Sequence, residues 1–272
     1  MQLIEHGGGP LVEVNDRIVD DAPHRPLTDR SPALRCRCDG ANVRIRDLMA
    51  SRQNRVDPTG DLQQATGRGM LTGNRGCLVD TTGEVVRFQR SALWISCVTE
   101  WRGRRQPLAA VGRWTPLFFL DEAVALAAGH RPCAYCRRSA YNSYVEAIRA
   151  SDGNGRRLNA TALNRRLAGE RSSSPGAPSA ARRGLARGEA RQTWPAELST
   201  LPTGTVFIED AGTAMLVTDD HVAAFSFDGW SHRTLRPETG VVQVLTPPTS
   251  VAALRHGYVP LLHPSARTPP AS

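Results

Sequence analysis

The sequence contains no lysine, so arginine accounts for all 34 of its Lys-or-Arg positions. The formal net charge is +8. An arginine guanidinium can contact phosphate through two parallel hydrogen bonds, so a chain this basic points to nucleic acid, and DNA first, as a partner. A GC-rich genome also favours arginine codons, and the many alanine, glycine and proline residues fit that second interpretation.

A long apolar run is missing too. No stretch approaches the roughly 18 consecutive apolar residues that a membrane-spanning helix needs. The start of the chain, MQLIEHGGGPLVEV, lacks the basic first segment and the continuous apolar centre of a secretory signal. We therefore expect a cytoplasmic protein with no membrane partner.

Several catalytic signatures are also lacking. The glycines at 69, 73 and 76 do not follow a strand in the order that a phosphate-binding loop requires, so nucleotide binding is not indicated. The sequence has no recognisable Ser/His/Asp arrangement, no His-Glu-x-x-His motif and no paired His-Asn-His signature. These absences argue against the common hydrolases.

What the sequence does have is six cysteines, at positions 36, 38, 77, 97, 133 and 136. The Cys-x-x-Cys spacing of Cys133 and Cys136 favours a metal over a disulfide in a cytoplasmic chain. Zinc takes four thiolate or imidazole ligands in a tetrahedron. Cys97 ends a predicted strand and can reach the same centre, and the fourth ligand is Cys77 or, alternatively, His130. The Cys-x-Cys pair at 36 and 38 is a further, separate candidate for metal binding.

The residues around Cys133 carry the clearest local structure. Phe118–Leu120 is typical of the end of a buried strand, and Asp121 is a good N-cap for an amphipathic helix that ends at Gly129. After the cysteines, residues 137–150 have the apolar spacing of a second amphipathic helix. Upstream, we expect a glycine-punctuated loop at 68–77, strands at 83–88 and 92–98, and a basic hairpin turn at 101–106.

The fold class that these patterns predict is α+β. A zinc-binding α/β module is expected at 49–150 and a small β-barrel-like domain, with a closing helix at 251–256, at 200–266. An arginine-rich linker at 151–199 joins the two. A poorly ordered extension at 1–48 precedes the zinc-binding module, and residues 267–272 form a tail. Residues 156–191 hold nine arginines against two glutamates, a net charge of +7 that is nearly the whole excess of the chain.

The segment FFLDEAVALAAGHRPCAYCRR resembles the end of the N-terminal zinc domain of the Ada family, bacterial DNA alkylation-repair proteins. In that family four cysteines bind zinc, and one of the upstream pair accepts a methyl group from a DNA phosphotriester. The resemblance implies that Cys133 and Cys136, and with them Cys97, bind zinc and that Arg131 lies near a DNA backbone. The upstream pair of the family is Cys-x-x-x-Cys, whereas here Trp101 stands where the partner of Cys97 would be. The whole chain, through its GNRGC, FFLDEA, VLTPP and HPSA segments, also resembles a family of actinobacterial proteins.

The sequence is compatible with three functions. The first is a zinc protein that binds nucleic acid, with a role related to DNA alkylation damage and a basic surface formed by Arg102, Arg104, Arg105, Arg131, Arg137 and Arg138. The second is a zinc enzyme, in which Cys97 accepts an alkyl group or the metal activates water with Glu100 or Glu122 as general base. The third is a partner-binding module with a structural zinc. The sequence predicts neither a substrate nor an oligomeric state.

Overall fold

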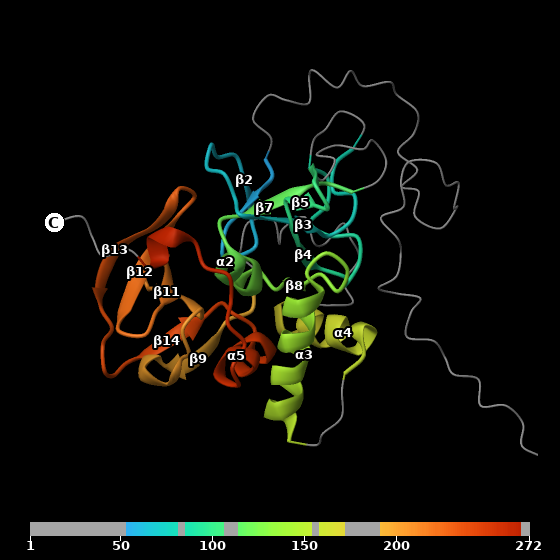
Figure 1. Cartoon of the computed structure of the whole chain (residues 1–272). Coiled ribbons are helices and arrows are strands. Elements are labelled where there is room, and N and C mark those ends of the chain that lie inside the picture. Colours follow the sequence, from blue (N-terminus) through green and yellow to red (C-terminus); the bar gives the residue numbers. More distant parts are fainter. Residues whose placement is uncertain (1–52, 81–84, 106–113, 154–157, 172–190, 268–272) are drawn as a thin grey trace, which may run out of the picture.

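The computed structural model of the chain describes residues 53–80, 85–105, 114–153, 158–171 and 191–267, and Figure 1 shows their arrangement. The predictions for residues 1–48 and for nearly all of the C-terminal tail lie outside these ranges. Helices and two separate six-stranded sheets make up the described chain, so the expected α+β class is confirmed. None of the helices in these ranges is long and apolar enough to span a membrane.

The first sheet is mixed and holds the strands that precede α3. Its order is β2-β1-β7-β3-β4-β8, in which the β1–β7 and β4–β8 pairs are parallel and the others are antiparallel. The strand bounds are β1 Arg55–Val56, β2 Leu62–Gln63, β3 Leu71–Asn74, β4 Ile95–Val98, β7 Leu117–Phe119 and β8 Arg131–Pro132. A separate hairpin, β5 (Glu100–Trp101) with β6 (Arg104–Arg105), forms the expected basic turn.

Two local predictions for this sheet are wrong. The glycine-punctuated segment at 68–77 contains β3, which is not a loop but an inner strand paired on both sides. Gly73 fits there because the Phe119 ring fills the space beside it, 2.3 Å from where a Cβ would stand. Of the strand expected at 83–88, the described part forms only an isolated bridge between Val79 and Val85.

The second sheet is antiparallel and comes mainly from the C-terminal part of the chain. Its order is β13-β12-β11-β10-β14-β9. The bounds are β9 Trp194–Glu197, β10 Val206–Ile208, β11 Ala214–Val217, β12 His221–Ser226, β13 Gly229–Leu235 and β14 Val241–Val244. Strands β13 and β9 are its two edges, so the sheet is open and the expected closed, barrel-like arrangement is not formed. A turn at 227–228 joins β12 to β13.

Four α-helices lie within the described residues. Their bounds are α2 Glu122–Ala127, α3 Arg138–Asp152, α4 Ala160–Arg171 and α5 Pro248–Arg255, with short 3-10 turns at Leu198–Thr200 and Pro264–Ala266. Helices α3, α4 and α5 share one core cluster, in which the T-shaped pair Tyr144–Tyr258 joins α3 to the segment after α5. Within the range predicted as a linker, α4 and β9 are regular structure.

Helix α2 lies at the centre of the molecule, between the two sheets (Figure 1). All six of its residues are buried, so the prediction of an amphipathic helix is wrong, and its small side chains are those of a helix covered on every face. One core cluster combines its alanines with Leu71 and Phe119 of the first sheet and with Val206 and Leu216 of the second. The packing of the two sheets is therefore continuous through α2.

The predicted caps of α2 are present. Asp121 is the N-cap, and its side chain accepts a hydrogen bond from the Val124 backbone N–H. The other carboxylate oxygen of Asp121 accepts from Trp230 Nε1 at 2.7 Å and from the His263 N–H at 2.9 Å. Gly129 follows the helix with a φ of +87°, a left-handed conformation that favours glycine. Sequence patterns at both ends of α2 thus predict its position in the chain, while its complete burial results from packing against the second sheet.

Candidate metal centre

Cys97 is positioned by β4, which lies between β3 and β8 in the first sheet. The backbone of Cys97 pairs with Thr72 of β3. Its neighbour Ser96 is fully buried and pairs with Pro132 of β8. The parallel pairing of β4 with β8 therefore brings the residue after β8, Cys133, next to Cys97.

The Cys-x-x-Cys turn begins where β8 ends. The Cys133 N–H donates to the Ser96 carbonyl at 2.9 Å, which continues the β4–β8 pairing by one residue. The Arg137 N–H then donates to the Cys133 carbonyl at 3.0 Å, and the Tyr135 N–H donates to Cys133 Sγ at 3.4 Å. These bonds close a tight turn that places Cys133 and Cys136 on one side, immediately before α3.

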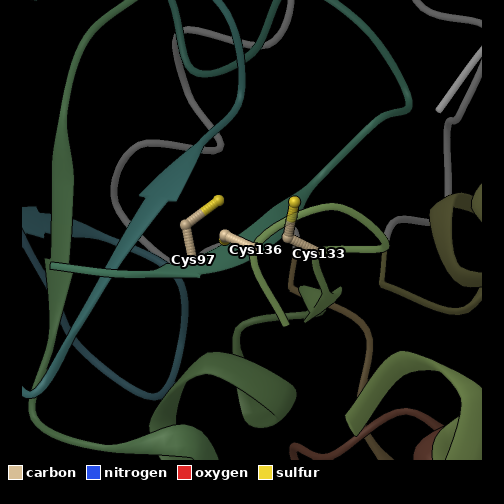
Figure 2. Close-up of side chains that lie close together, drawn as sticks. All are labelled: Cys97, Cys133 and Cys136. Carbon is tan, nitrogen blue, oxygen red and sulfur yellow. The ribbon is translucent and has the colours of Figure 1, made fainter. Parts of the chain in front are cut away.

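The three side chains form a buried thiol cluster, which Figure 2 shows with Cys97 on the strand and Cys133 and Cys136 on the adjoining turn. Their sulfur atoms all lie within 4.8 Å of one another. Each residue is between 4% and 6% exposed. A group of three close cysteines from two separate elements can hold a metal ion.

The protons in the cluster are shared unequally. Hydrogen bonds from Cys136 and Cys97 hold the pKa of the Cys133 thiol well below its ordinary range. The bond to Cys133 is also the main reason why the pKa of Cys136 rises to about 11. Bonds to Cys133 and Cys136, and then burial, raise the pKa of Cys97 well above its usual value. In the metal-free protein the cluster thus holds one thiolate and two thiols.

Apolar and aromatic side chains surround the cluster. Ile95, Val98, Trp101 and Tyr135 pack against the three cysteines. The rings of Trp101 and Tyr135 lie 5.7 Å apart, and the buried Trp101 Nε1 has no hydrogen-bond partner among the described residues. Trp101, at the position where the Ada-type pattern has its second upstream cysteine, is thus part of the wall of the cluster.

Neither candidate for the fourth ligand belongs to the cluster. Cys77 is buried, and its thiol donates to the Val79 carbonyl at 3.5 Å. The His130 ring lies against the Trp94 and Phe119 rings, and its Nε2 accepts a hydrogen bond from Arg75 Nε at 3.2 Å. Burial, and then the nearby arginines, hold the pKa of His130 well below its ordinary value. This histidine is therefore a neutral core residue here.

The predicted basic surface is divided between exposed and internal arginines. Arg102 and Arg138 are exposed, and Arg104 and Arg105 form β6. Arg131 is fully buried: its Nε donates to Asn164 Oδ1 at 2.8 Å and its guanidinium lies over the Tyr141 ring, so it is not on the surface. Arg137 forms an internal ion pair instead.

That ion pair uses Glu122, one of the two candidate general bases. Arg137 Nη2 lies 2.7 Å from Glu122 Oε2, and the side chains are 7% and 1% exposed. Glu122 also accepts from the Tyr258 hydroxyl at 2.5 Å and from the Leu261 N–H at 2.8 Å. With three partners it links the residue after the Cys-x-x-Cys turn to the C-terminal segment. Glu100, the other candidate, is exposed on β5.

Sequence reasoning missed a group of internal arginines. Arg171 and Arg191 count toward the basic segment at 156–191, yet Arg171 is buried and Arg191 half-buried at the C-terminal end of α2. Arg171 donates to the Gly129 carbonyl, and Arg191 donates to the Ala127 carbonyl. Arginines at this end of a helix satisfy its last carbonyls. Nothing in their local sequence distinguishes them from the other arginines of the segment.

Comparisons with protein-family models, with curated proteins and with solved structures find no match to this chain. The geometry of the thiol cluster is therefore the main guide to its function.

Proposed function

We propose that Cys97, Cys133 and Cys136 bind one zinc ion. The observation that carries this proposal is the meeting of three sulfurs within 4.8 Å from two elements that are far apart in the sequence. Cysteine thiolates are common zinc ligands, and a Cys-x-x-Cys turn followed by a helix is a frequent way to present two of them. The bound ion would cross-link β4 to the segment that joins β8 to α3.

The fourth position is open to a water molecule or to a ligand from outside the described residues. Cys36 and Cys38 are the remaining cysteines of the chain. Four sulfur ligands would favour a closed structural site, whereas three sulfurs and water would leave a position for chemistry. The low exposure of the three cysteines supports a structural ion over the alternative of an alkyl acceptor at Cys97, because an alkylated substrate must reach the sulfur.

Nucleic-acid binding, with DNA as the first partner to test, is the second part of the proposal. The Ada-type resemblance of the Cys-x-x-Cys segment, the net charge of +8 and the exposed Arg102 and Arg138 near the cluster support it. Arg102 lies at the tip of the β5–β6 hairpin, with its guanidinium 5.5 Å from the Trp101 ring centre. A role in alkylation damage would need this binding in addition to the zinc ion.

Elemental analysis of the full chain, purified under reducing conditions, tests the zinc centre. We expect one zinc per chain, lost in Cys97→Ser and in Cys133→Ser but kept in Cys77→Ser, which is the matched control for removing a buried cysteine. Cobalt substitution of the wild type and of a Cys36→Ser/Cys38→Ser variant then counts the sulfur ligands, because thiolate-to-cobalt absorption grows with each one. A metal-free wild type, or full zinc in Cys97→Ser, would refute the centre.

Fluorescence anisotropy with labelled DNA tests the second part. We expect DNA binding that weakens steeply with salt. Arg102→Gln/Arg138→Gln should reduce both the affinity and its salt dependence, because each phosphate contact removed lowers the salt slope by about 1. Arg149→Gln/Arg255→Gln, which removes two exposed arginines on α3 and α5, is the charge-matched control. If the protein contains zinc but shows no DNA binding, or binding that does not depend on salt, nucleic-acid binding is refuted and the metal centre is not.

A further inference from the structure

A second cluster of charge surrounds Trp94 and the C-terminal end of α2. The guanidinium carbons of Arg75 and Arg171 each lie 3.9 Å from the centre of the Trp94 ring. Arg75 is fully buried, and Arg171 is 4% exposed. A third guanidinium, that of Arg191, bonds the carbonyls of Ala127 and Leu245. Three cationic groups therefore meet inside the protein.

Their hydrogen-bond partners are mostly neutral. Arg75 donates to the Gly60 carbonyl at 2.8 Å, and Arg191 donates to the Leu245 carbonyl at 2.7 Å. Within the described residues, neither Arg75 nor Arg191 has a carboxylate at ion-pair distance. Carbonyl oxygens satisfy N–H donors without balancing their charge. The nearby carboxylates of Asp57 and Asp61 offset two of the three positive charges, so one positive charge remains in excess, and burying an uncompensated charge is costly.

Two charged donors are also left without partners. Arg75 Nη2 and Arg191 Nε are buried and have no hydrogen-bond partner among the described residues. Burial, followed by repulsion from Arg191, lowers the pKa of Arg75 to about 9, and the carboxylates of Asp57 and Asp61 oppose this shift. Burial lowers the pKa of Arg191 to about 10. Both groups still carry their charge at neutral pH, so the cost of burying it is present in the folded protein.

A cavity adjoins two of the three arginines, Arg171 and Arg191. It measures about 20 Å³ and is lined by Arg171 and Arg191 together with Phe88, Gln89, Trp94 and Ala128. One water needs roughly 10–15 Å³ of such space, so the cavity has room for a single compact group and excludes an extended ligand. Gln89 adds a half-buried side chain whose buried amide oxygen has no partner among the described residues. Turned over, that amide would present N–H donors to an anion.

We propose that this cavity, the arginine cavity, binds one compact inorganic anion of the size of chloride. The anion would accept hydrogen bonds from the guanidinium groups that line the cavity and would offset the charge gathered around Trp94. This site is separate in chemistry from the thiol cluster, since it uses cationic donors where the cluster uses thiolates. The anion would stabilise the junction at which the end of α2 contacts residues after α4.

Thermal unfolding of the full chain in chloride and in gluconate, at equal sodium concentration, tests the proposal. Gluconate is too large for the cavity and controls for ionic strength and general salt effects. We expect Tm to rise with chloride alone, logarithmically above the dissociation constant, by roughly 3 °C for each tenfold increase. The chloride NMR line should broaden when the wild-type protein is added, and the broadening should saturate over the chloride concentrations around the dissociation constant.

Variants assign the effect to the cavity. Ala128→Val fills the space and keeps every arginine, so it should abolish the chloride-specific rise, as should Arg191→Gln. Arg149→Gln, an exposed arginine on α3, should leave the rise intact. Equal responses to the two salts, persistence of the rise in Ala128→Val, or no line broadening by the wild type would leave the cavity to water and overturn the proposal. The NMR result decides even if a variant fails to fold.

Discussion

Proton sharing distinguishes the three thiols of the cluster. Cys97 and Cys136 have raised pKa values and Cys133 a lowered one, so at neutral pH the metal-free site carries two protons on sulfur. Metal ligation requires thiolates, and binding must therefore release those protons.

We predict that zinc affinity rises steeply with pH. Releasing two protons lowers the apparent Kd by about 100-fold per pH unit while the pH stays below the raised pKa values. Competition with a chromophoric chelator between about pH 6.5 and 7.5 measures this slope. Cys136→Ser removes one proton-bearing ligand, so any zinc binding that remains should follow pH about tenfold per unit. An affinity independent of pH would contradict the shared-proton arrangement.

Removing the charge of Glu122 should lower the free energy of unfolding. Its carboxylate is 1% exposed and pairs with a buried Arg137, so Glu122→Gln leaves a cation without its counter-charge. We expect a loss of about 3–5 kcal/mol in the free energy of unfolding. Glu146→Gln breaks the exposed pair with Arg149 and should cost less than about 0.5 kcal/mol. Urea unfolding of both variants measures the difference, and equal small losses would show that Glu122 is not a structural anchor.

The chemistry of single residues was partly predictable. Cys-x-x-Cys spacing finds Cys133 and Cys136, because two cysteines in one turn leave a local signature. Cys97 follows from its place at the end of a predicted strand and from the family resemblance. The exclusion of Cys77 and the burial of Arg131 depend on strand pairing and helix packing between distant segments, and no local pattern encodes them.

At the scale of elements, β3 shows how glycine can serve an inner strand. Gly73→Ala would place a methyl group 2.3 Å from Phe119 Cε2, so we predict a loss of about 1–3 kcal/mol. Gly169, on α4, has open space beside it, and Gly169→Ala should raise stability by about 0.5–1 kcal/mol through helix propensity. Urea unfolding compares the two variants. A neutral Gly73→Ala would mean that the Phe119 ring moves aside freely.

Elements with a strong local signal were predicted and those without it were not. The caps of α2 and the apolar face of α3 with Tyr141, Tyr144 and Ile148 are read from the sequence and are present. Strand β3 was missed because its glycine suits neighbours that the sequence cannot place. The expected strand at 83–88 has branched residues but, in its described part, no partner beyond one bridge, since β propensity alone does not supply a neighbouring strand.

At the scale of the whole molecule, α2 makes one core out of two sheets. Its alanines contact apolar residues of both, and the carboxylates of Asp121 and Glu122 bind the segment after α5. We predict a single cooperative unfolding transition for the zinc-bound chain, with equal calorimetric and van't Hoff enthalpies. Differential scanning calorimetry measures both. Two separate transitions would instead support independent domains at 49–150 and 200–266, as the sequence suggests.

The parallel pairing of β4 with β8 has a consequence for the chain between them. With a metal ion joining Cys97 to Cys133, the intervening residues form a covalently and coordinatively closed ring whose ends are fixed at one point. The entropy of closing such a ring grows only slowly with its length, by about 0.6 kcal/mol for each doubling. The β5–β6 hairpin, with Arg102 and Gly103 at its tip, lies on that ring and outside both large sheets. Extra residues at this tip would lengthen the ring without moving the metal, which makes the hairpin the natural place for a tethered probe or an inserted peptide.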